Sequence, residues 1–211
     1  MKKNPISFLR NETQTLLLQN GRVIKLRKNE SLFSQGQPAE SFYVVLSGAL
    51  KLKKNPEKAL LDLAGPGELV GAGVMKLAAK SPCYPITAKA LGATEVLKLS
   101  KDFFSQSLEQ DSELLAYADH QVIRRLHRIQ NDRRIQRFTL EAKVAYFLTE
   151  KVAPLGQLKI TRQDIANGIG ASTEAVIRLM SKWSRDHLIS TAKQEISIFN
   201  LDALKTFWLT T

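Results

Sequence analysis

Hydrophobic and polar positions alternate in short runs along the first half of the chain. Between about residues 21 and 99, runs rich in apolar and β-branched residues are separated by turn signals such as Gln35-Gly36-Gln37-Pro38. These runs predict strands at residues 22–26, 42–46, 49–53, 60–63, 86–90 and 95–99. Regularly spaced short strands with glycine turns are typical of a β-sandwich or jelly roll, although another β domain would fit the same pattern.

The pattern then becomes helical. From about residue 111 to 137 the chain contains no Gly or Pro, and apolar residues recur at spacings of three and four. This places them on one face of a helix about 40 Å long. The residues of this face are Leu115, Ala118, Val122, Leu126 and Ile129. Such a helix between two domains pairs most simply with its own copy, so we predict a homodimer. The alternative is that the face packs on the chain's own β domain.

Residues 161–186 have the pattern of a helix-turn-helix. Thr161 and Ser172 are placed to cap two helices, Asp164 lies near the positive end of the first, and Gly170 permits the turn between them. The apolar side of the second helix consists of Val176, Leu179, Met180 and Trp183. Its outer side carries Thr173, Glu174, Ile177, Arg178 and Lys182. A DNA recognition helix requires such a division, because apolar residues hold it while polar residues reach base edges.

Two residues of this helix have the chemistry for reading bases. Arg178 can donate two hydrogen bonds to guanine, and Glu174 can accept one from the cytosine amino group. Because they are four residues apart, a surface ion pair between them is the alternative interpretation. A hairpin at residues 188–191 and 195–199 is predicted to form the wing of a winged helix, with Lys193 at its tip placed for a DNA phosphate.

Charge adds only weak support for DNA. The net charge is +11, but residues 138–211 contain nine Lys and Arg against seven Asp and Glu. Residues 120–137, with six Arg and one Asp, are much more basic. The part that would read DNA is therefore not the most basic part, and charge alone does not identify it.

Composition also excludes several classes of protein. The single cysteine, Cys83, rules out an internal disulfide and a cysteine-ligated cluster within one chain. The sequence has neither a signal peptide nor an apolar run of the roughly 18 residues that a membrane span needs, so we expect a cytoplasmic protein with no membrane partner. It shows no nucleophile with its base, no metal cluster and no phosphate loop, so we expect neither an enzyme nor a cofactor.

Along nearly its whole length the chain resembles the cyclic-AMP receptor protein and fumarate-nitrate regulator (CRP/FNR) family. The resemblance lies in the arginine-rich Arg124-Arg125-Leu126, in residues 161–165 and 170–178, and in the glycines Gly36, Gly48, Gly65, Gly67 and Gly71. It implies an α+β fold in three parts. These are a jelly-roll-like β-roll of the cyclic-nucleotide-binding type at 1–110, a dimerisation helix at 111–137, and a winged helix-turn-helix domain at 138–211.

The resemblance further implies a homodimer on a two-fold symmetric site in double-stranded DNA, with RNA polymerase as a further partner. The base-reading positions are Thr173, Glu174, Ile177 and Arg178. Many relatives carry Arg where Thr173 stands, and Ile177 replaces a small residue and is placed for a thymine methyl group. Phosphate contacts are expected from Thr161, Arg162, Gln163, Ser172, Lys182 and Lys193. An adaptor module with the same fold and no role at DNA is the alternative function.

The effector site departs from the family pattern. Its candidate residues are Gly71, Ala72, Cys83, Tyr84, Pro85, Ile129 and Gln130. Relatives that bind cyclic AMP carry Glu in place of Ala72, Arg-Ser in place of Tyr84-Pro85 and Thr-Ser in place of Ile129-Gln130. A buried phosphate without its arginine loses a charge-assisted pair. We therefore predict that cyclic AMP is not bound in the usual way, and that the effector is a different molecule or absent.

Other sensing chemistry is equally poorly supported by these residues. The iron–sulfur relatives need several cysteines, and the haem-binding relatives need a histidine in the β domain, whereas His120, His127 and His187 all lie later in the chain. Cys83 lies beside the lost phosphate site, which leaves two interpretations. It is either a thiol sensor or an inert small apolar residue.

Overall fold

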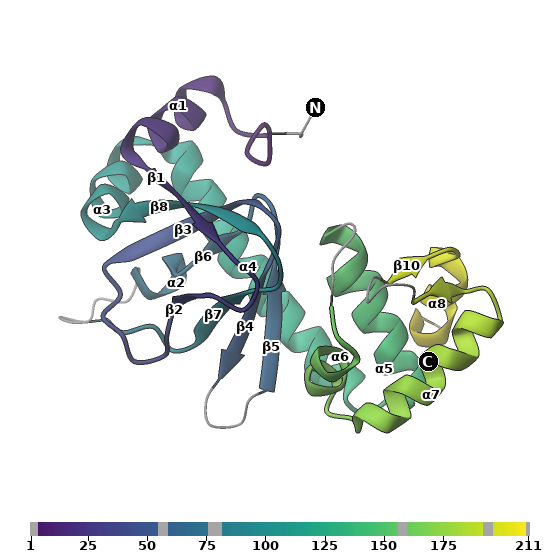
Figure 1. Ribbon diagram of the computed structural model, residues 1–211. Coiled ribbons are helices and arrows are strands. Elements are labelled where there is room, and N and C mark those ends of the chain that lie inside the picture. Colours follow the sequence, from purple (N-terminus) through teal and green to yellow (C-terminus); the bar gives the residue numbers. More distant parts are fainter. Residues whose placement is uncertain (1–3, 55–58, 76–81, 156–159, 192–195, 210–211) are drawn as a thin grey trace.

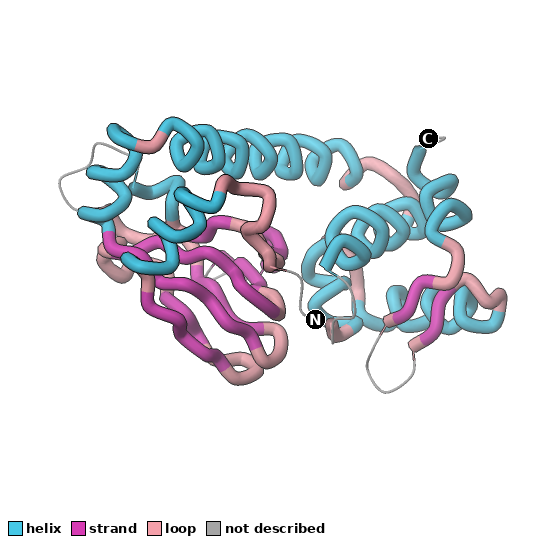
Figure 2. The backbone as a smooth tube through the Cα atoms, turned by 90° about the horizontal axis from the view of Figure 1, so that it is seen from above, coloured by secondary structure: helices cyan, strands magenta, loops and turns pink. Residues whose placement is uncertain are grey.

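The computed structural model describes residues 4–54, 59–75, 82–155, 160–191 and 196–209 (Figure 1). Along the chain these form an N-terminal β-roll with its covering helices, one long helix, and a mainly helical C-terminal domain. Figure 2 shows the long helix running from the side of the roll to the C-terminal domain. The α+β fold predicted from the sequence is confirmed. Among the described helices, none is both long and apolar enough to span a membrane.

The roll contains two four-stranded antiparallel sheets. One has the order β1-β8-β3-β6 and the other β2-β7-β4-β5. The strands are β1 (Arg22–Leu26), β2 (Ser31–Phe33), β3 (Ser41–Ser47), β4 (Leu50–Lys54), β5 (Ala59–Ala64), β6 (Leu69–Val70), β7 (Thr87–Ala90) and β8 (Thr94–Ser100). All six predicted strands are present, whereas β2 and β6 escaped prediction because three and two residues are too few to show a period.

Alternation along the strands gives the roll two apolar layers. Leu50 and Leu52 of β4 point into the core between the sheets, together with Val45 and Val96. Phe42, on the other face of β3, joins a second core against the covering helices. These helices are α1 (Asn11–Asn20), the short α2 (Ala72–Met75), and α3 (Lys101–Gln110), which Ser100 caps through the amide of Phe103.

The long helix α4 (Ser112–Ile135) packs on the roll along one side only. Leu114, Tyr117 and Ala118 are buried in the second core of the roll. Among the residues predicted for the dimer face, Leu115, Leu126 and Ile129 are 37%, 53% and 44% exposed, and Val122 is half-buried. Ala118 departs from that prediction, because at 1% exposure it faces its own roll. The other positions leave an apolar strip open along α4.

The C-terminal domain begins at Thr139, whose side chain caps α5 (Leu140–Tyr146). The helix continues through a π-helical turn, η1 (Phe147–Val152), and a 3-10 turn, η2 (Ala153–Leu155). After α6 (Arg162–Ile169) and α7 (Thr173–Arg185), β9 (Ile189–Ser190) pairs with β10 (Ser197–Ile198) at the place predicted for the wing. The predicted wing residue Lys193 lies outside the described residues. The last helix is α8 (Leu201–Leu209), capped by Asn200.

The C-terminal domain packs on the outer face of the β2-β7-β4-β5 sheet. Ala49, Leu63 and Leu91 of the roll share one apolar core with the residues of α5, α6 and α7. Leu155 lies against Gly65, where a Cβ would be only 2.0 Å from the leucine side chain. The two domains are therefore in direct contact, and the helix-turn-helix lies beside the roll.

Candidate nucleic-acid interface

Local capping positions the two helices of the motif. The Thr161 hydroxyl oxygen accepts a hydrogen bond from the amide of Asp164 at 3.0 Å, and the hydroxyl oxygen of Ser172 accepts one from the amide of Ala175 at 3.2 Å. Between them Gly170 has a φ of +66°, in the left-handed region that favours glycine. Both caps and the glycine turn were predicted from the sequence, and the structure confirms them.

The apolar side of α7 holds the helix in place. Val176, Leu179, Met180 and Trp183 are buried together with Ile165, Ala166 and Ile169 of α6. Trp183 also packs on Phe207 of α8, with 5.2 Å between ring centroids. The four buried residues of α7 are those predicted from the sequence. The helix therefore turns its predicted apolar side toward the domain core.

This rotation turns the predicted base-reading side chains outward. Glu174 and Arg178 are exposed and Ile177 is 46% exposed, all on the first two turns of α7. Within the described part of the chain, no ion pair joins Glu174 to Arg178, so the alternative surface salt bridge is not formed here. Both side chains are therefore available to a ligand.

Thr173 is engaged differently from its neighbours. Its hydroxyl donates a hydrogen bond to the side-chain oxygen of Gln163 at 2.8 Å, and the Gln163 amide donates to Asn167 at 2.9 Å. This chain of bonds fixes Gln163 at the start of α6 and brings the N-terminal ends of α6 and α7 together. Helix N-termini attract phosphate through their positive dipole and unpaired amides.

The other residues predicted to contact phosphate lie around these two ends. Thr161 and Ser172 are exposed, Arg162 is half-buried beside them, and Lys182 is exposed further along α7. Thr161, Arg162, Gln163 and Ser172 therefore stand at the starts of the two helices, whereas Lys182 lies in the last turn of α7 and Lys193 lies outside the described residues.

One link at this site was missed from the sequence. Asp164 is buried at 5% exposure, and its carboxylate accepts a hydrogen bond from the Thr161 hydroxyl at 2.9 Å. The same carboxylate lies 3.5 Å from the ammonium group of Lys51 and 3.7 Å from that of Lys53, both on β4. These partners are over a hundred positions away in the chain, so no local pattern reveals them.

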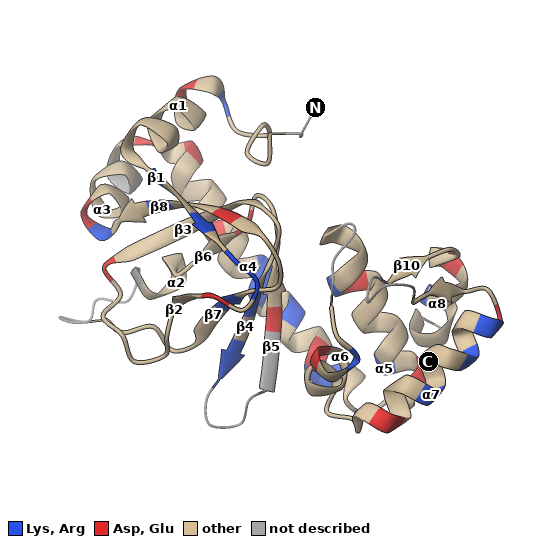
Figure 3. Cartoon of the chain, in the orientation of Figure 1, with Lys and Arg blue, Asp and Glu red and all other residues tan. Residues whose placement is uncertain are grey.

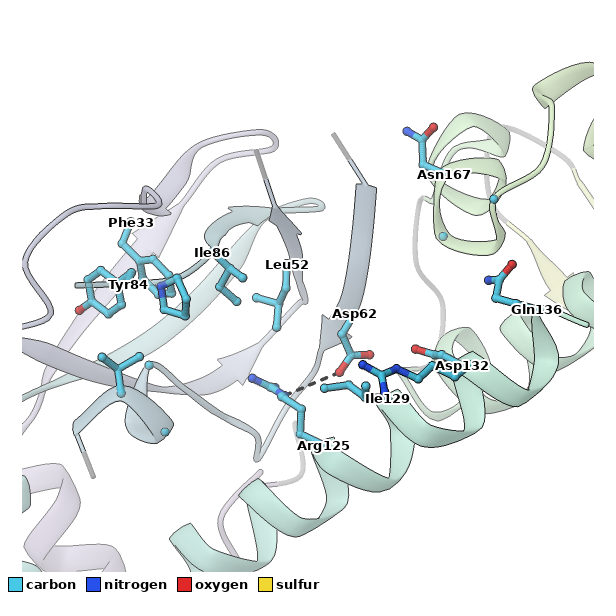
Figure 4. Close-up of a pocket in the computed structure, with 17 residues that line it drawn as sticks. Phe33, Leu52, Asp62, Tyr84, Ile86, Arg125, Ile129, Asp132, Gln136 and Asn167 are labelled. Atoms are coloured by element: carbon cyan, nitrogen blue, oxygen red, sulfur yellow. Dashed lines mark ion pairs between the residues drawn. The ribbon is translucent and has the colours of Figure 1, made fainter. Parts of the chain in front are cut away.

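A cavity of about 670 Å³ lies between the roll, α4 and α6 (Figure 4). Four of the predicted effector residues line it: Gly71, Tyr84, Pro85 and Ile129. Ala72 lines a smaller neighbouring cavity, Cys83 is exposed beside another on the roll, and Gln130 is exposed on α4. The predicted residues therefore do not form one site.

The interior of the cavity is mostly apolar. Tyr84 is buried, its ring stacks on Phe33 with 3.9 Å between centroids, and its hydroxyl donates a hydrogen bond to the carbonyl of Ser41. Burial raises the pKa of Tyr84 well above its usual value. The cations on the wall come from α4, and Arg125 already lies 3.7 Å from Asp62 (Figure 4). Tyr84 therefore contributes an aromatic ring and no positive charge to the wall of the cavity.

A cluster of charged groups joins the roll, α4 and the C-terminal domain. The ammonium group of Lys151, 4% exposed, lies 2.7 Å from Asp132 of α4 and 3.9 Å from Asp62 of β5. Arg128 pairs with Asp62 at 3.4 Å and with Glu68. Burial raises the pKa of Asp132, and the positive charge of Lys151 offsets this only in part. The cluster ties the helix-turn-helix domain to the roll.

Comparison with known proteins agrees with this architecture. Residues 23–111 match the model of the cyclic nucleotide-binding domain, and residues 142–207 match the Crp-like helix-turn-helix domain. The transcriptional activator protein anr of Pseudomonas aeruginosa is 28% identical over 93% of this chain and 84% of its own length. The nitrogen fixation regulation protein FixK of Bradyrhizobium diazoefficiens is 28% identical over 85% of this chain and 79% of its own.

Solved structures share the fold. FixK2 from Bradyrhizobium japonicum has a TM-score of 0.75 at 20% identity, covering 90% of this chain and 98% of its own. The c-di-GMP responsive global regulator CLP from Xanthomonas campestris has a TM-score of 0.71 at 21% identity, covering 90% of this chain and 99% of its own. Both domain models, in this order and joined by one long helix, cover most of the chain. The chain therefore belongs to the CRP/FNR family of DNA-binding transcription regulators.

Proposed function

We propose that the protein works as a homodimer that reads a two-fold symmetric DNA site, with one α7 in each of two successive major grooves. The observation that carries this proposal is the division of α7. One side is locked into the domain core, while Glu174, Ile177 and Arg178 are exposed on its first two turns. The division of the chain into residues 1–110, 111–137 and 138–211 is part of this proposal.

Each exposed position has a role that follows from its chemistry. Arg178 donates to guanine, Glu174 accepts from the cytosine amino group, and Ile177 contacts a thymine methyl group. Thr173 acts mainly by orienting Gln163, to which it is hydrogen-bonded. The backbone of the DNA is held by Thr161, Arg162, Gln163, Ser172, Lys182 and Lys193.

The open strip on α4 supports the dimer. The strip contains the exposed Leu115, Leu126 and Ile129 with the half-buried Val122, and the neighbouring Ile123 is 51% exposed. An exposed row of apolar side chains along a long helix is typical of a surface that a second copy of the helix covers. RNA polymerase is the further partner through which a DNA-bound dimer would act on transcription. The proposal places the protein in the cytoplasm with its DNA and assigns it no catalysis.

We also propose that the cavity does not take cyclic AMP in the family's usual way. Tyr84, tied to Phe33 and Ser41, stands where the phosphate would need a cation, and Ala72 lacks the carboxylate that would hold the ribose. Calorimetric titration with cyclic AMP should give no saturable heat at micromolar concentrations. A clear binding isotherm in that range would contradict this part of the proposal.

Selection of bound sequences from random DNA tests the function as a whole. The purified protein should enrich one sequence and its inverted copy, with half-site centres about 10 base pairs apart, because the two recognition helices of a dimer lie about one helical turn apart. Enrichment of no sequence would contradict DNA reading and would favour the adaptor module. A single half-site without its inverted copy would contradict the dimeric arrangement.

A further inference from the structure

Three lysines lie on the face of the roll that is turned toward the helix-turn-helix, and we call them the roll lysines: Lys51, Lys53 and Lys89. Lys51 and Lys89 are directly paired across β4 and β7. Lys53 is two residues along β4 from Lys51 and therefore projects from the same face of the sheet. Ala49 and Leu63, on this face as well, pack against the C-terminal domain.

The roll lysines carry more charge than their surroundings neutralise. Asp164 is the acidic partner of both Lys51 and Lys53, while Lys89 forms no ion pair with any described residue. Asp62 on β5 is already engaged by arginines of α4 and by Lys151. Like charges directly opposite one another destabilise a sheet. Three ammonium groups against one carboxylate therefore leave this face positive.

This positive face is continuous with the predicted phosphate contacts of the motif. One oxygen of the Asp164 carboxylate faces Lys51 and Lys53, and the other accepts the hydrogen bond from Thr161. Thr161 stands at the start of α6, where the DNA backbone is expected. Figure 3 shows the lysines of β4 as a blue segment beside β5, the strand that lies next to α6. A single carboxylate thus separates the roll lysines from Thr161.

We propose that Lys53 and Lys89, the two more exposed roll lysines, form a second contact with the DNA backbone, on phosphates next to the half-site that α7 reads, while Lys51 holds Asp164. The inference rests on the proposed function, because it takes the orientation of DNA from α6 and α7. Duplex DNA carries one negative charge per about 1.7 Å of its axis, so a positive face adjoining Thr161 meets further phosphates. The β-roll then contributes directly to DNA affinity, and its contact with α6 affects how tightly the dimer holds its site.

Lys89 and Lys53 are the positions to change. Lys51 is only 9% exposed, so replacing it would remove the more buried partner of the Asp164 carboxylate and disturb the contact between the domains. Lys89→Ala removes a charge that no described acid pairs with, and Lys53→Ala removes the more exposed partner of Asp164. The matched control is Lys98→Ala, an exposed lysine on β8 in the other sheet of the same roll.

The measurement is the salt dependence of binding to a DNA duplex. This duplex carries the site that the wild-type protein selects, together with flanking DNA on both sides. Each phosphate contact contributes about 0.9 to the slope of log K against log salt, so a dimer that loses one contact per protomer should lose about 2. We expect this decrease for Lys89→Ala and for Lys53→Ala, with base preference unchanged. Lys98→Ala should keep the wild-type slope. Slopes equal to that of the control in both variants would overturn the inference.

A second duplex, trimmed to the two half-sites, separates a direct contact from a loss of domain packing. The effect of both variants should shrink on the trimmed duplex, because the flanking phosphates are gone. An equal loss on both duplexes would mean that the lysines act only by holding α6, and would overturn the inference while leaving the proposed function intact. If the wild-type protein selects no site, the proposed function and this inference fall together.

Discussion

At the scale of single residues, the turn of the DNA-binding motif depends on Gly170. Its φ of +66° is a conformation that costs a residue with a Cβ about 1 kcal/mol or more. We expect Gly170→Ala to lower the free energy of unfolding of the C-terminal domain by about 1 kcal/mol, measured by urea unfolding. Gly92→Ala is the control, because nothing lies within 4 Å of its added Cβ and its φ is not positive. Equal stability of the two variants would contradict the role of Gly170.

Residues of the DNA-binding motif show which features of the site could be predicted from the sequence. Thr161, Gly170 and Ser172 were predicted because a cap or a turn depends on neighbours two or three positions away. Asp164 was read only as a favourable charge near a helix start. Its pairing with Lys51 depends on how two domains meet, and the two residues are 113 positions apart. Contacts between domains leave no periodic signal in one chain.

At the scale of elements, the start of α4 depends on the Asp111 carboxylate. Burial alone would raise the pKa of Asp111, but hydrogen bonds from the Leu114 amide, the Thr13 hydroxyl and the Glu113 amide, with the charge of Arg10, lower it below its ordinary 3.8. A carboxylate whose pKa is lower in the folded state contributes stability that is complete above the unfolded pKa. That stability is lost as the pH falls through the folded pKa.

Replacing Asp111 by Asn keeps a side chain that caps well but removes the charge. We therefore expect the free energy of unfolding of the wild type to fall more steeply below about pH 4 than that of Asp111→Asn. Urea unfolding at several pH values between about 5 and 3 measures this difference. Parallel curves would show that the cap contributes no charge-dependent stability.

The open strip of α4 makes a prediction about assembly. Leu126→Glu places a charge where a second α4 is expected, and burying an unpaired charge is costly. We expect the dimer dissociation constant to rise at least about tenfold, which corresponds to about 1.4 kcal/mol, measured by sedimentation equilibrium. Leu18→Glu on α1 is the control, since Leu18 is 50% exposed and Leu126 is 53% exposed. A similar effect of both changes would argue that the strip is not the dimer contact.

Element prediction succeeded where a pattern repeats and failed where it does not. Six strands and the long helix follow from periods of two and of three to four. The strands β2 and β6 are too short to show one. Ala118 has the spacing of the predicted dimer face, but the roll covers this position in the structure. The spacing of apolar residues along a helix does not by itself show which neighbour covers each position.

At the scale of the whole molecule, the roll and the helix-turn-helix form one packed unit in this structure. The cluster around Lys151, the apolar contact of Leu155 with Gly65 and the pairing of Asp164 all cross the boundary between the domains. The largely apolar cavity is lined by the roll, by α4 and by α6 residues such as Asn167. A molecule bound there would contact all three parts, so its occupancy would bear on the position of α6 and α7.

The most direct test of the account is the affinity of Arg178→Ala for the selected site and for an unrelated duplex at the same salt concentration. Arg178 is exposed on the second turn of α7 and is assigned to a base rather than to the backbone. The change should cost about 1 to 3 kcal/mol at the selected site and leave binding to the unrelated duplex nearly unchanged. An equal loss on both duplexes would contradict base reading by α7.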